Sequence, residues 1–354
     1  MKVKEKLLLR PNDFKPYFKN WKIEGVFNPG AIRDKENRVI LFVRVAERFL
    51  SKSKYEYPVI IPERKGKYKI EKVDDDIFLR KEGNVIFLRN NTVRLSNISH
   101  FRKVVLDKSG EKIIKIEKEP VFFPCEEYEE CGVEDPRIVK INDKYYMTYV
   151  SVSIRDGITT SLAVSKNLVK WERKGIIFNH ENKDVTLFPE KINKEFVALH
   201  RPVGTFNFNN PSIWISYSKN LIYWGKSRCI LHPRRDSSWD NIRIGAGCPP
   251  LKTSSGWLEI YHGVNNRVYS AGAVLLDLKN PEKIIAQTPI EKPLFSPSNF
   301  YDKKGFVNNV SFPTGIVEDL DKKSVLIYSG SADKYITLRK IKISDILRSL
   351  EKVK

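Results

Sequence analysis

The chain has 354 residues, of which 41% are hydrophobic, and its 63 Lys and Arg against 43 Asp and Glu give a net charge of +20. The basic residues are spread over turns such as ERKGKYK, without zinc-finger spacing, an RNP-type motif or an Arg-rich tract, so we expect no nucleic-acid partner. No stretch approaches the roughly 18 apolar residues of a membrane span, and the N-terminal MKVKEKLLLRPNDF lacks a signal-peptide core, so we expect a cytoplasmic protein without a membrane partner.

A proline-containing hairpin pattern recurs along the chain. Each copy has a proline, a short apolar strand, a polar turn, and a second strand that ends in aromatic or β-branched residues. The copies begin, in chain order, at Asn28, Asp135, Phe188, Pro249 and Phe312. Strands joined by short polar turns are typical of β-hairpins, so the pattern predicts the same hairpin five times.

A second element alternates with these hairpins. SKNLVKW at 165–171 recurs as SKNLIYW at 218–224, and LDLKNPEKII from Leu276 is a looser copy. Each of these segments follows an apolar strand, so each unit holds two hairpins. The prolines that mark the units, at positions 136, 189, 250 and 313, lie 53, 61 and 63 residues apart. Four-stranded units repeating at such a period are typical of a β-propeller.

We therefore expect an all-β fold, a five-bladed β-propeller with a short C-terminal helix, as a single catalytic domain over residues 1–354. The first blade is expected to carry an insertion between Arg44 and Asp135. The helix is expected from Ile343, where ISDILRSLEKVK places Asp345 early and apolar residues at helical spacing.

The repeat also predicts where polar side chains gather. If the blades superpose, the residues beside the repeated prolines and at the ends of the second strands surround one axial pocket. These residues are Asn28, Arg44, Asp135, Arg137, Glu190, His200, Arg201, Lys252, His262 and Asp333. Carboxylates and amides can hold sugar hydroxyls, and Arg and Lys can hold a phosphate. The mixture is therefore suited to a site for a sugar and an anion.

The stretch CGVEDPRI is the most distinctive part of this set. Asp135 and Arg137 are two positions apart and should share a face, while Glu134 should point away. The following proline is expected to hold Asp135 in extended backbone. A purely structural Asp–Arg pair at a blade edge is the alternative interpretation. Simpler interpretations also remain for His200, as a hydrogen-bonded core histidine, and for Lys252, as a solvated turn lysine.

Several longer motifs support a family resemblance. They are GVEDPRI with YYMTYV, LFPEKI, HRP, IGAGCPPLKTSSGWLEIYHGV, AGAVLLDLKNPEKIIA, and VSFPTGIVED with YSGSAD. Together, from about Asn28 to Asp333, they resemble glycoside hydrolase family 130, the β-mannoside phosphorylases and related β-mannosidases. The resemblance implies a five-bladed propeller and an inverting attack on a non-reducing-end β-mannosyl unit. It also implies that Asp135 is the catalytic acid, whose proton passes in some members through the O3 hydroxyl of the sugar.

The resemblance implies a phosphorylase that uses inorganic phosphate as co-substrate and releases α-mannose 1-phosphate. Phosphate is already an anion, so no protein base is needed to activate it as the nucleophile. Cations are needed to bind it and to orient one of its oxygens toward the sugar. The residues matched to phosphate binding are Arg201, Lys252, His262 and Lys183. Substrate binding is expected from Asn28, Arg44, Arg94, Glu134, Arg137, Glu190, His200 and Asp333. No cofactor and no metal are expected, because the acids and the four cysteines lack ligand spacing.

Two other functions remain possible interpretations of the same residues. An inverting β-mannosidase would need a second carboxyl group roughly 6.5–9.5 Å from the first, and Glu190 is the only obvious candidate. A non-catalytic carbohydrate-binding propeller would not need Asp135 at all. FVRVAE and residues 133–153 resemble the family members that act on β-1,2-linked manno-oligosaccharides more than the β-1,4 group. The β-1,2 linkage is therefore favoured over β-1,4. The acceptor length and a homo-oligomeric state stay open.

Overall fold

The chain folds almost entirely into antiparallel β-strands in the computed structural model, which describes residues 3–64, 66–204, 208–234 and 238–353. The helical segments are short: η1 (Pro11–Asp13), η2 (Glu127–Glu129), α1 (Phe300–Lys303) and α2 (Ile343–Arg348). The predicted all-β class is confirmed, and α2 begins at the expected residue. None of the helices formed by the described residues is long and apolar enough to cross a membrane.

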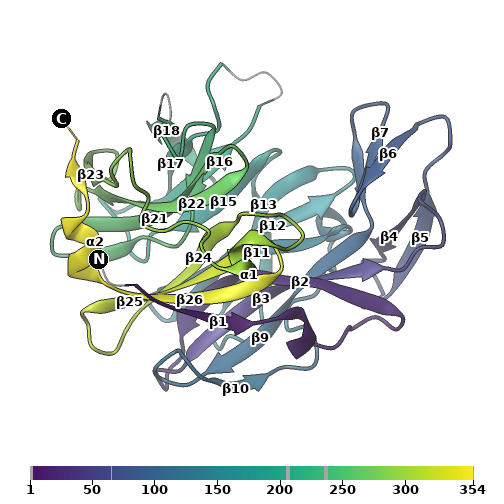
Figure 1. Cartoon of the computed structure of the whole chain (residues 1–354), viewed down its shortest axis with the longest axis horizontal. Coiled ribbons are helices and arrows are strands. Elements are labelled where there is room, and N and C mark those ends of the chain that lie inside the picture. The colour runs from purple at the N-terminus through teal and green to yellow at the C-terminus, as the bar shows by residue number, and fades with distance from the viewer. Residues whose placement is uncertain (1–2, 65, 205–207, 235–237, 354) are drawn as a thin grey trace.

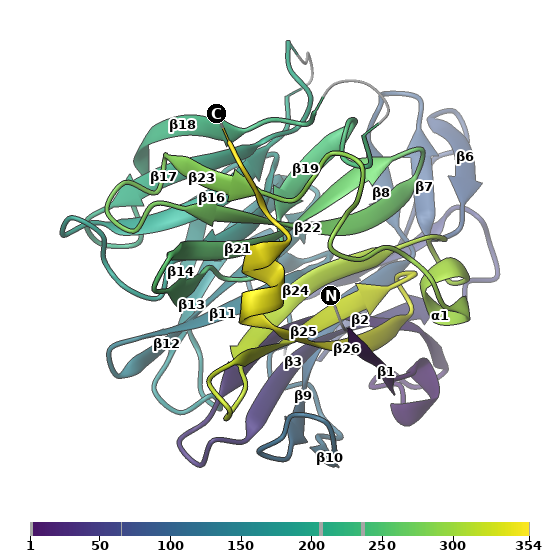
Figure 2. The same ribbon diagram turned by 60° about the vertical axis from the view of Figure 1, so that its left-hand side comes forward.

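Five sheets make up most of the molecule (Figures 1 and 2). The first sheet contains β2 (Trp21–Arg33), β3 (Val39–Phe49), β9 (Asn97–Leu106) and β10 (Ile113–Ile116). The second contains β11 (Gly132–Ile141), β12 (Lys144–Ser153), β13 (Gly157–Ser165) and β14 (Glu172–Phe178). The third contains β15 (Asn182–Leu187), β16 (Phe196–Pro202), β17 (Ile213–Ser218) and β18 (Gly225–Leu231).

The last two sheets include both ends of the chain. The fourth sheet contains β19 (Arg243–Ala246), β20 (Leu251–Thr253), β21 (Gly256–Asn265), β22 (Val268–Leu276), β23 (Ile284–Gln287) and β27 (Glu351–Lys352). The fifth contains β24 (Ser311–Glu318), β25 (Ser324–Ser331), β26 (Tyr335–Lys342) and β1 (Lys4–Leu9). The N-terminal strand β1 thus completes a sheet whose other strands come from the end of the chain (Figure 2).

The sheets contact one another in a cycle. Strand β2 contacts both β11 and β24, β11 contacts β15, and β15 contacts β19. Strands β21 and β22 of the fourth sheet contact β24 of the fifth, which completes the cycle. The first strands of neighbouring sheets therefore lie beside one another, and residues near the same end of these strands can reach a common site.

Apolar side chains fill the spaces between neighbouring sheets. Leu41 and Val43 of the first sheet pack with Leu326 and Leu338 of the fifth in one buried cluster. Full burial of each such side chain contributes about 1.5–3 kcal/mol to folding relative to exposure.

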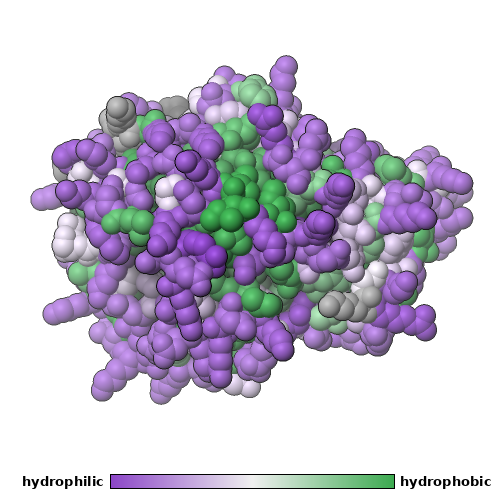
Figure 3. Space-filling view, turned by 90° about the horizontal axis from the view of Figure 1, so that it is seen from below, coloured by the Kyte–Doolittle hydropathy of each residue, from purple (hydrophilic) through white to green (hydrophobic). Residues whose placement is uncertain are grey.

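Figure 3 shows a face that is mostly hydrophilic, with an island of hydrophobic residues near its centre.

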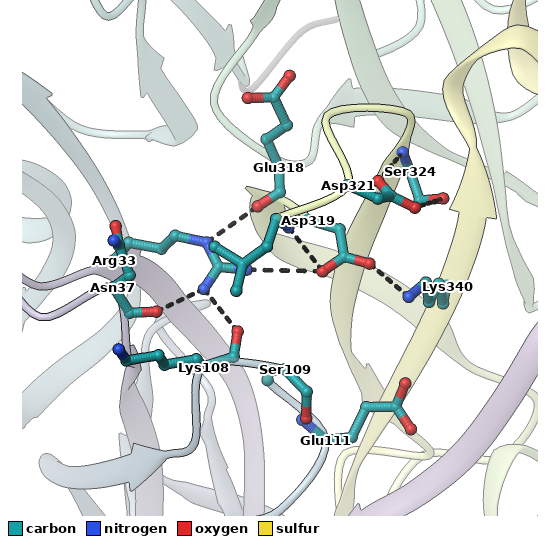
Figure 4. Close-up of polar contacts among 12 residues, drawn as sticks. Arg33, Asn37, Lys108, Ser109, Glu111, Glu318, Asp319, Asp321, Ser324 and Lys340 are labelled. Carbon is teal, nitrogen blue, oxygen red and sulfur yellow. Dashed lines mark hydrogen bonds and ion pairs between the residues drawn. The ribbon is translucent and has the colours of Figure 1, made fainter.

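A polar network joins the first and fifth sheets (Figure 4). Arg33 donates from Nε to the carbonyl of Glu318 (2.9 Å) and from Nη1 to the carbonyls of Asn37 (2.6 Å) and Lys108 (2.9 Å). Its Nη2 lies 3.9 Å from Oδ1 of Asp319, whose other oxygen pairs with a lysine of β26. One guanidinium thus holds turns from opposite ends of the chain together.

The expected insertion lies between β3 and β9. It forms a two-stranded sheet of β4 (Glu56–Ile60) and β5 (Tyr68–Lys72), and a three-stranded sheet of β6 (Phe78–Glu82), β7 (Val85–Leu88) and β8 (Val93–Leu95). Both small sheets lie on the right of Figure 1, at one side of the cycle of larger sheets.

Candidate active site

Three first strands contain the same local irregularity. Asn28 in β2, Asp135 in β11 and Asp184 in β15 have φ angles of 46°, 50° and 55°, and each lies at a shift in strand register. Asn and Asp tolerate this left-handed backbone better than most residues. A bulge of this kind redirects a side chain. The expectation of extended backbone at Asp135 is therefore wrong, and so is the expectation that Glu134 points away from it.

The bulge brings both acids to one arginine. Oδ1 of Asp135 accepts hydrogen bonds from Nδ2 of Asn28 (2.9 Å) and from Nη1 of Arg44 (2.9 Å). Nη2 of Arg44 pairs with Oε1 of Glu134 at 2.5 Å. Nε of Arg44 donates to Oγ of Ser99 (3.1 Å), which fixes the guanidinium. We call Asn28, Arg44, Glu134 and Asp135 the acid group.

Asp333 follows β25 and lies beside the acid group. Desolvation raises its pKa to about 7, the negative charges of Asp135 and Glu134 add to the increase, and Arg44 opposes it. A carboxyl group with this pKa changes its charge close to neutral pH. Its charged neighbours are the carboxylates of Asp135 and Glu134 and the guanidinium of Arg44. The net charge of this set of four side chains therefore changes as Asp333 gains or loses its proton.

This raised pKa predicts a pH dependence of stability. The folded protein binds a proton at Asp333 between pH 3.8 and about 7, where the unfolded chain has released it, so the stability attributable to Asp333 falls as pH rises through that window. Relative to Asp333→Asn, the free energy of unfolding of the wild type should fall by about 4 kcal/mol between pH 4 and 8. Denaturant unfolding at both pH values measures this difference, and a constant difference would contradict the assignment.

A second cluster surrounds Asp184. Its Oδ2 accepts from Nε of Arg201 (2.6 Å) and lies 3.7 Å from Nε2 of His262, while Oδ1 accepts from Nη2 of Arg137 (3.1 Å). Burial would raise the pKa of Asp184, but Arg201, His262 and Arg137 outweigh it and hold the pKa well below its usual range. Burial also lowers the pKa of His262 to about 3, so its imidazole is neutral near pH 7 and the two guanidiniums carry the positive charge.

Arg243 belongs to the same cluster, although the sequence did not single it out. It begins β19, its Nη2 donates to the hydroxyl of Tyr269, and its guanidinium lies 5.4 Å from the centre of that ring. The rings of Tyr269 and His262 are stacked 6.3 Å apart. Nε of Arg243 and Nδ1 of His262 are buried, and neither has a hydrogen-bond partner in the part of the chain that the structure describes. We call Arg137, Asp184, Arg201, Arg243 and His262 the cation group.

Arg137 connects the two groups. Its Nη1 donates to the carbonyl of Asp135 (3.0 Å), its Nη2 to Asp184, and its Nε to the carbonyl of Gly247 (2.8 Å). The side chain is buried. Arg137 of the cation group therefore links Asp184 to the backbone of Asp135 in the acid group.

The structure does not bring Glu190 and Lys252 to either group. They form an ion pair with each other at 2.6 Å, and about half of each side chain is exposed. The reason is register: Pro136 and Pro313 lie inside their strands, whereas Pro189 follows the end of β15 and Pro250 follows the end of β19. Residues next to Pro189 and Pro250 therefore lie beyond the ends of β15 and β19, whereas Asp184 and Arg243 lie near the starts of these strands.

Three other predicted residues have clear surroundings. His200 bonds Asn182 through Nδ1 and Oγ of Ser216 through Nε2 (2.8 Å), and burial lowers its pKa to about 4, which fits the simpler interpretation of a core histidine. Lys183 pairs in register with Arg201 and is partly exposed. Arg94 lies in β8 of the insertion, 5.8 Å from the ring of Tyr57.

A cavity of about 180 Å³ opens beside the acid group. Arg44, Glu134 and Asp333 line it, together with Leu95 of the insertion and Phe306. Sites for drug-sized ligands measure roughly 300–1,000 Å³, so this cavity suits a smaller unit such as one sugar ring. Within the described ranges, no three His, Cys, Asp or Glu side chains are grouped so that they could hold a metal ion.

Comparisons with known proteins agree with a carbohydrate-active site. A family model described as beta-1,4-mannooligosaccharide phosphorylase matches residues 84–352. The chain is 34% identical to the beta-1,2-mannobiose phosphorylase of Listeria innocua, over 99% of this chain and 98% of that protein. It is 41% identical to a 1,2-beta-oligomannan phosphorylase of a Thermoanaerobacter species, over 68% of this chain and 78% of that protein. The solved structure of the Listeria innocua enzyme with beta-1,2-mannobiose superposes with a TM-score of 0.89 at 32% identity, covering 99% of both chains.

Proposed function

The chain belongs to glycoside hydrolase family 130, and from this premise we propose that it is an inverting β-mannoside phosphorylase. It transfers the non-reducing-end β-mannosyl unit of a manno-oligosaccharide to inorganic phosphate and releases α-mannose 1-phosphate. The β-1,2 linkage is favoured because the relative matched over its full length is a beta-1,2-mannobiose phosphorylase. The observation that supports the proposal is that Arg137 of the cation group bonds both Asp184 and the backbone of Asp135 in the acid group, so the two groups adjoin.

Asp135 is the proposed catalytic acid. Asn28 and Arg44 hold its Oδ1, and Oδ2 makes no hydrogen bond within the described residues, so one oxygen stays available for proton transfer. A positioned carboxyl group that delivers a proton in the transition state typically contributes 10²–10⁴-fold in rate. Arg44 also fixes the carboxyl plane, so the proton leaves in a defined direction toward a hydroxyl of the bound sugar.

The cation group is the proposed phosphate site. The guanidiniums of Arg137 and Arg201 pair with the one carboxylate of Asp184, and the charge of Arg243 acts on the neighbouring His262, which leaves an excess of positive charge. Arg201 uses Nε for Asp184, and its two Nη groups make no hydrogen bond within the described residues, so they remain free for phosphate oxygens. Guanidinium forks suit phosphate geometry, and fixed cations orient an anionic nucleophile without reorganisation.

We also propose that the five sheets are the blades of a β-propeller that forms one catalytic domain. The cyclic contacts among β2, β11, β15, β19 and the fourth and fifth sheets support this arrangement. The strands β1 and β26 pair across the first and last parts of the chain, as expected for a ring that one blade closes. Hydrolysis is not favoured, because Glu190, the candidate base, pairs with Lys252 away from the acid group.

Phosphate dependence is the direct test of this function. The protein incubated with β-1,2-mannobiose should release mannose 1-phosphate when phosphate is present and little free mannose when it is absent, because Asp184, the carboxylate of the cation group, is paired with Arg137 and Arg201 and is not available to activate water. Anion-exchange chromatography of the products, with β-1,4-mannobiose as the comparison substrate, measures both linkage and reaction. Free mannose released at the same rate with and without phosphate would show a hydrolase instead.

A further inference from the structure

Glu259 is a buried acid without an ionic partner. It lies in the middle of β21, it is fully buried, and no ion pair to it forms within the described residues. Acidic side chains are rarely buried in this way unless they are paired. Burial raises the pKa of Glu259 well above its usual range, and the hydrogen bond from the N–H of Gly247 and the positive charge of Arg137 oppose that rise.

The contact that Glu259 does make is with a single peptide. Its Oε1 accepts a hydrogen bond from the backbone N–H of Gly247 at 3.0 Å, and its Oε2 is buried with no hydrogen-bond partner among the described residues. Gly247 also leaves no room for another residue type, because a Cβ there would lie 2.3 Å from the carbonyl oxygen of Ile260 and 2.8 Å from that of Pro313. The peptide is thus confined by packing and held at its nitrogen by one side chain.

The same glycine holds Arg137 through its carbonyl group. Nε of Arg137 donates to that oxygen at 2.8 Å, and Nη2 approaches the carbonyl oxygen of Ala246 at 3.4 Å. A shift of Gly247 would therefore rotate the guanidinium, whose remaining donors bind the carbonyl of Asp135 and the carboxylate of Asp184. Arg201 shares that carboxylate, so the displacement would reach the proposed phosphate site.

We propose that Glu259 is a positioning residue for phosphate binding, acting through Gly247 and Arg137. The proposal rests on the function proposed above for the cation group. Glu259 touches neither sugar nor phosphate; it fixes the peptide that aims the guanidinium between the acid group and the cation group. What the position requires is a hydrogen-bond acceptor of this size, not a negative charge.

Two substitutions separate this role from simple core packing. Glu259→Gln keeps an oxygen acceptor for Gly247 and has nearly the same volume, so phosphate affinity should stay within about twofold of the wild type. Glu259→Met fills the space but offers only a weak acceptor, so phosphate affinity should fall by about tenfold. Isothermal titration with inorganic phosphate measures affinity, and kinetics with β-1,2-mannobiose should show a higher KM for phosphate and a smaller change in kcat.

Thermal unfolding of each variant completes the comparison. A purely structural Glu259 would lower the melting temperature in Glu259→Met and leave phosphate affinity unchanged, which would overturn the proposal. Equal losses of affinity in the Gln and Met variants would overturn it as well, because the acceptor would then not be what matters. If the Met variant does not fold, Glu259→Gln decides alone: affinity more than about fivefold weaker contradicts the proposal and unchanged affinity supports it.

Failure of the proposed function gives a different result. A wild-type protein that binds phosphate but releases free mannose from β-1,2-mannobiose would refute phosphorolysis, and the binding comparison among the three proteins would still test the role of Glu259. A wild-type protein that does not bind phosphate would refute both.

Discussion

Replacing Asp135 with Asn should lower turnover by about 10³-fold, without loss of the fold. The amide oxygen can still accept hydrogen bonds from Asn28 and Arg44, as Oδ1 does in the wild type, so the side chain keeps its place. The amide cannot release and recover a proton, however, and the departing sugar must then leave as an unprotonated alkoxide. Initial rates of mannose 1-phosphate formation measure the loss.

Glu134→Gln is the matched control for this variant. Glu134 binds the same guanidinium as Asp135 through Nη2 of Arg44, so its neutralisation changes the local charge equally. If charge beside Arg44 were the whole effect, both variants would lose activity to the same extent. Wild-type turnover in Asp135→Asn would show that Asp135 is a structural residue.

Replacing Arg201 with Ala should lower kcat/KM for phosphate by about 10²-fold or more, mainly through a higher KM. The variant loses the two Nη groups that are free for phosphate, and it leaves Asp184 with only Arg137 as a hydrogen-bonded cation. The carboxylate would then repel the incoming anion. Initial rates at varied phosphate concentration, at saturating β-1,2-mannobiose, measure the change.

Lys252→Ala provides the control for Arg201→Ala. Lys252 is a cation that was expected at the phosphate site, but it is half exposed and pairs with Glu190 at 2.6 Å. Its removal should leave the KM for phosphate within about twofold of the wild type, since exposed ion pairs contribute little. A large rise in KM for Lys252→Ala, or none for Arg201→Ala, would contradict the proposed site. Arg201→Lys keeps the positive charge but loses the two-pronged guanidinium. It tests whether charge alone is enough for phosphate binding.

Much of the fold follows from local patterns in the sequence. Alternating apolar positions and polar turns predict the hairpins, and the gap between Arg44 and Asp135 predicts an insertion, which forms two small sheets. These features depend on nearby residues, so the sequence displays them directly. The SKNL segments at 165–168 and 218–221 likewise form equivalent turns, in which Ser165 and Ser218 each accept backbone hydrogen bonds.

The candidate site was only partly predictable, because it depends on register. Asn28, Arg44, Asp135 and Arg201 were selected by their motifs, and the structure brings them to the two groups. Aligning the repeats on their prolines predicted that Glu190 and Lys252 lie at the same position along their strands as Asp135. The prolines, however, do not occupy the same position in each strand. Bulges shift the pairing by one residue, and an extra residue is not visible in a pattern of apolar and polar positions.

Two residues were missed for the same reason. Asp184 follows Lys183 in NKDV, and Arg243 precedes IGAG, and both lie one strand before the proline that drew attention. A signal was nevertheless present: Asp184, like Asn28 and Asp135, is an Asx residue within a first strand, where left-handed backbone favours that residue type. Aligning the strands on these positions instead of on the prolines would have found it.

The pairing of β1 with β26 has a consequence for how the molecule is made. Lys4 pairs with Lys340, so strand β1 finds its partner only after the residues up to β26 have been synthesised. Contacts between residues so distant in sequence form slowly, and unpaired strand edges are prone to aggregate in the meantime. Nascent chains should therefore depend on chaperones until β26 has been synthesised, and a tag placed directly before β1 would hinder a late step of folding, the docking of β1 against β26.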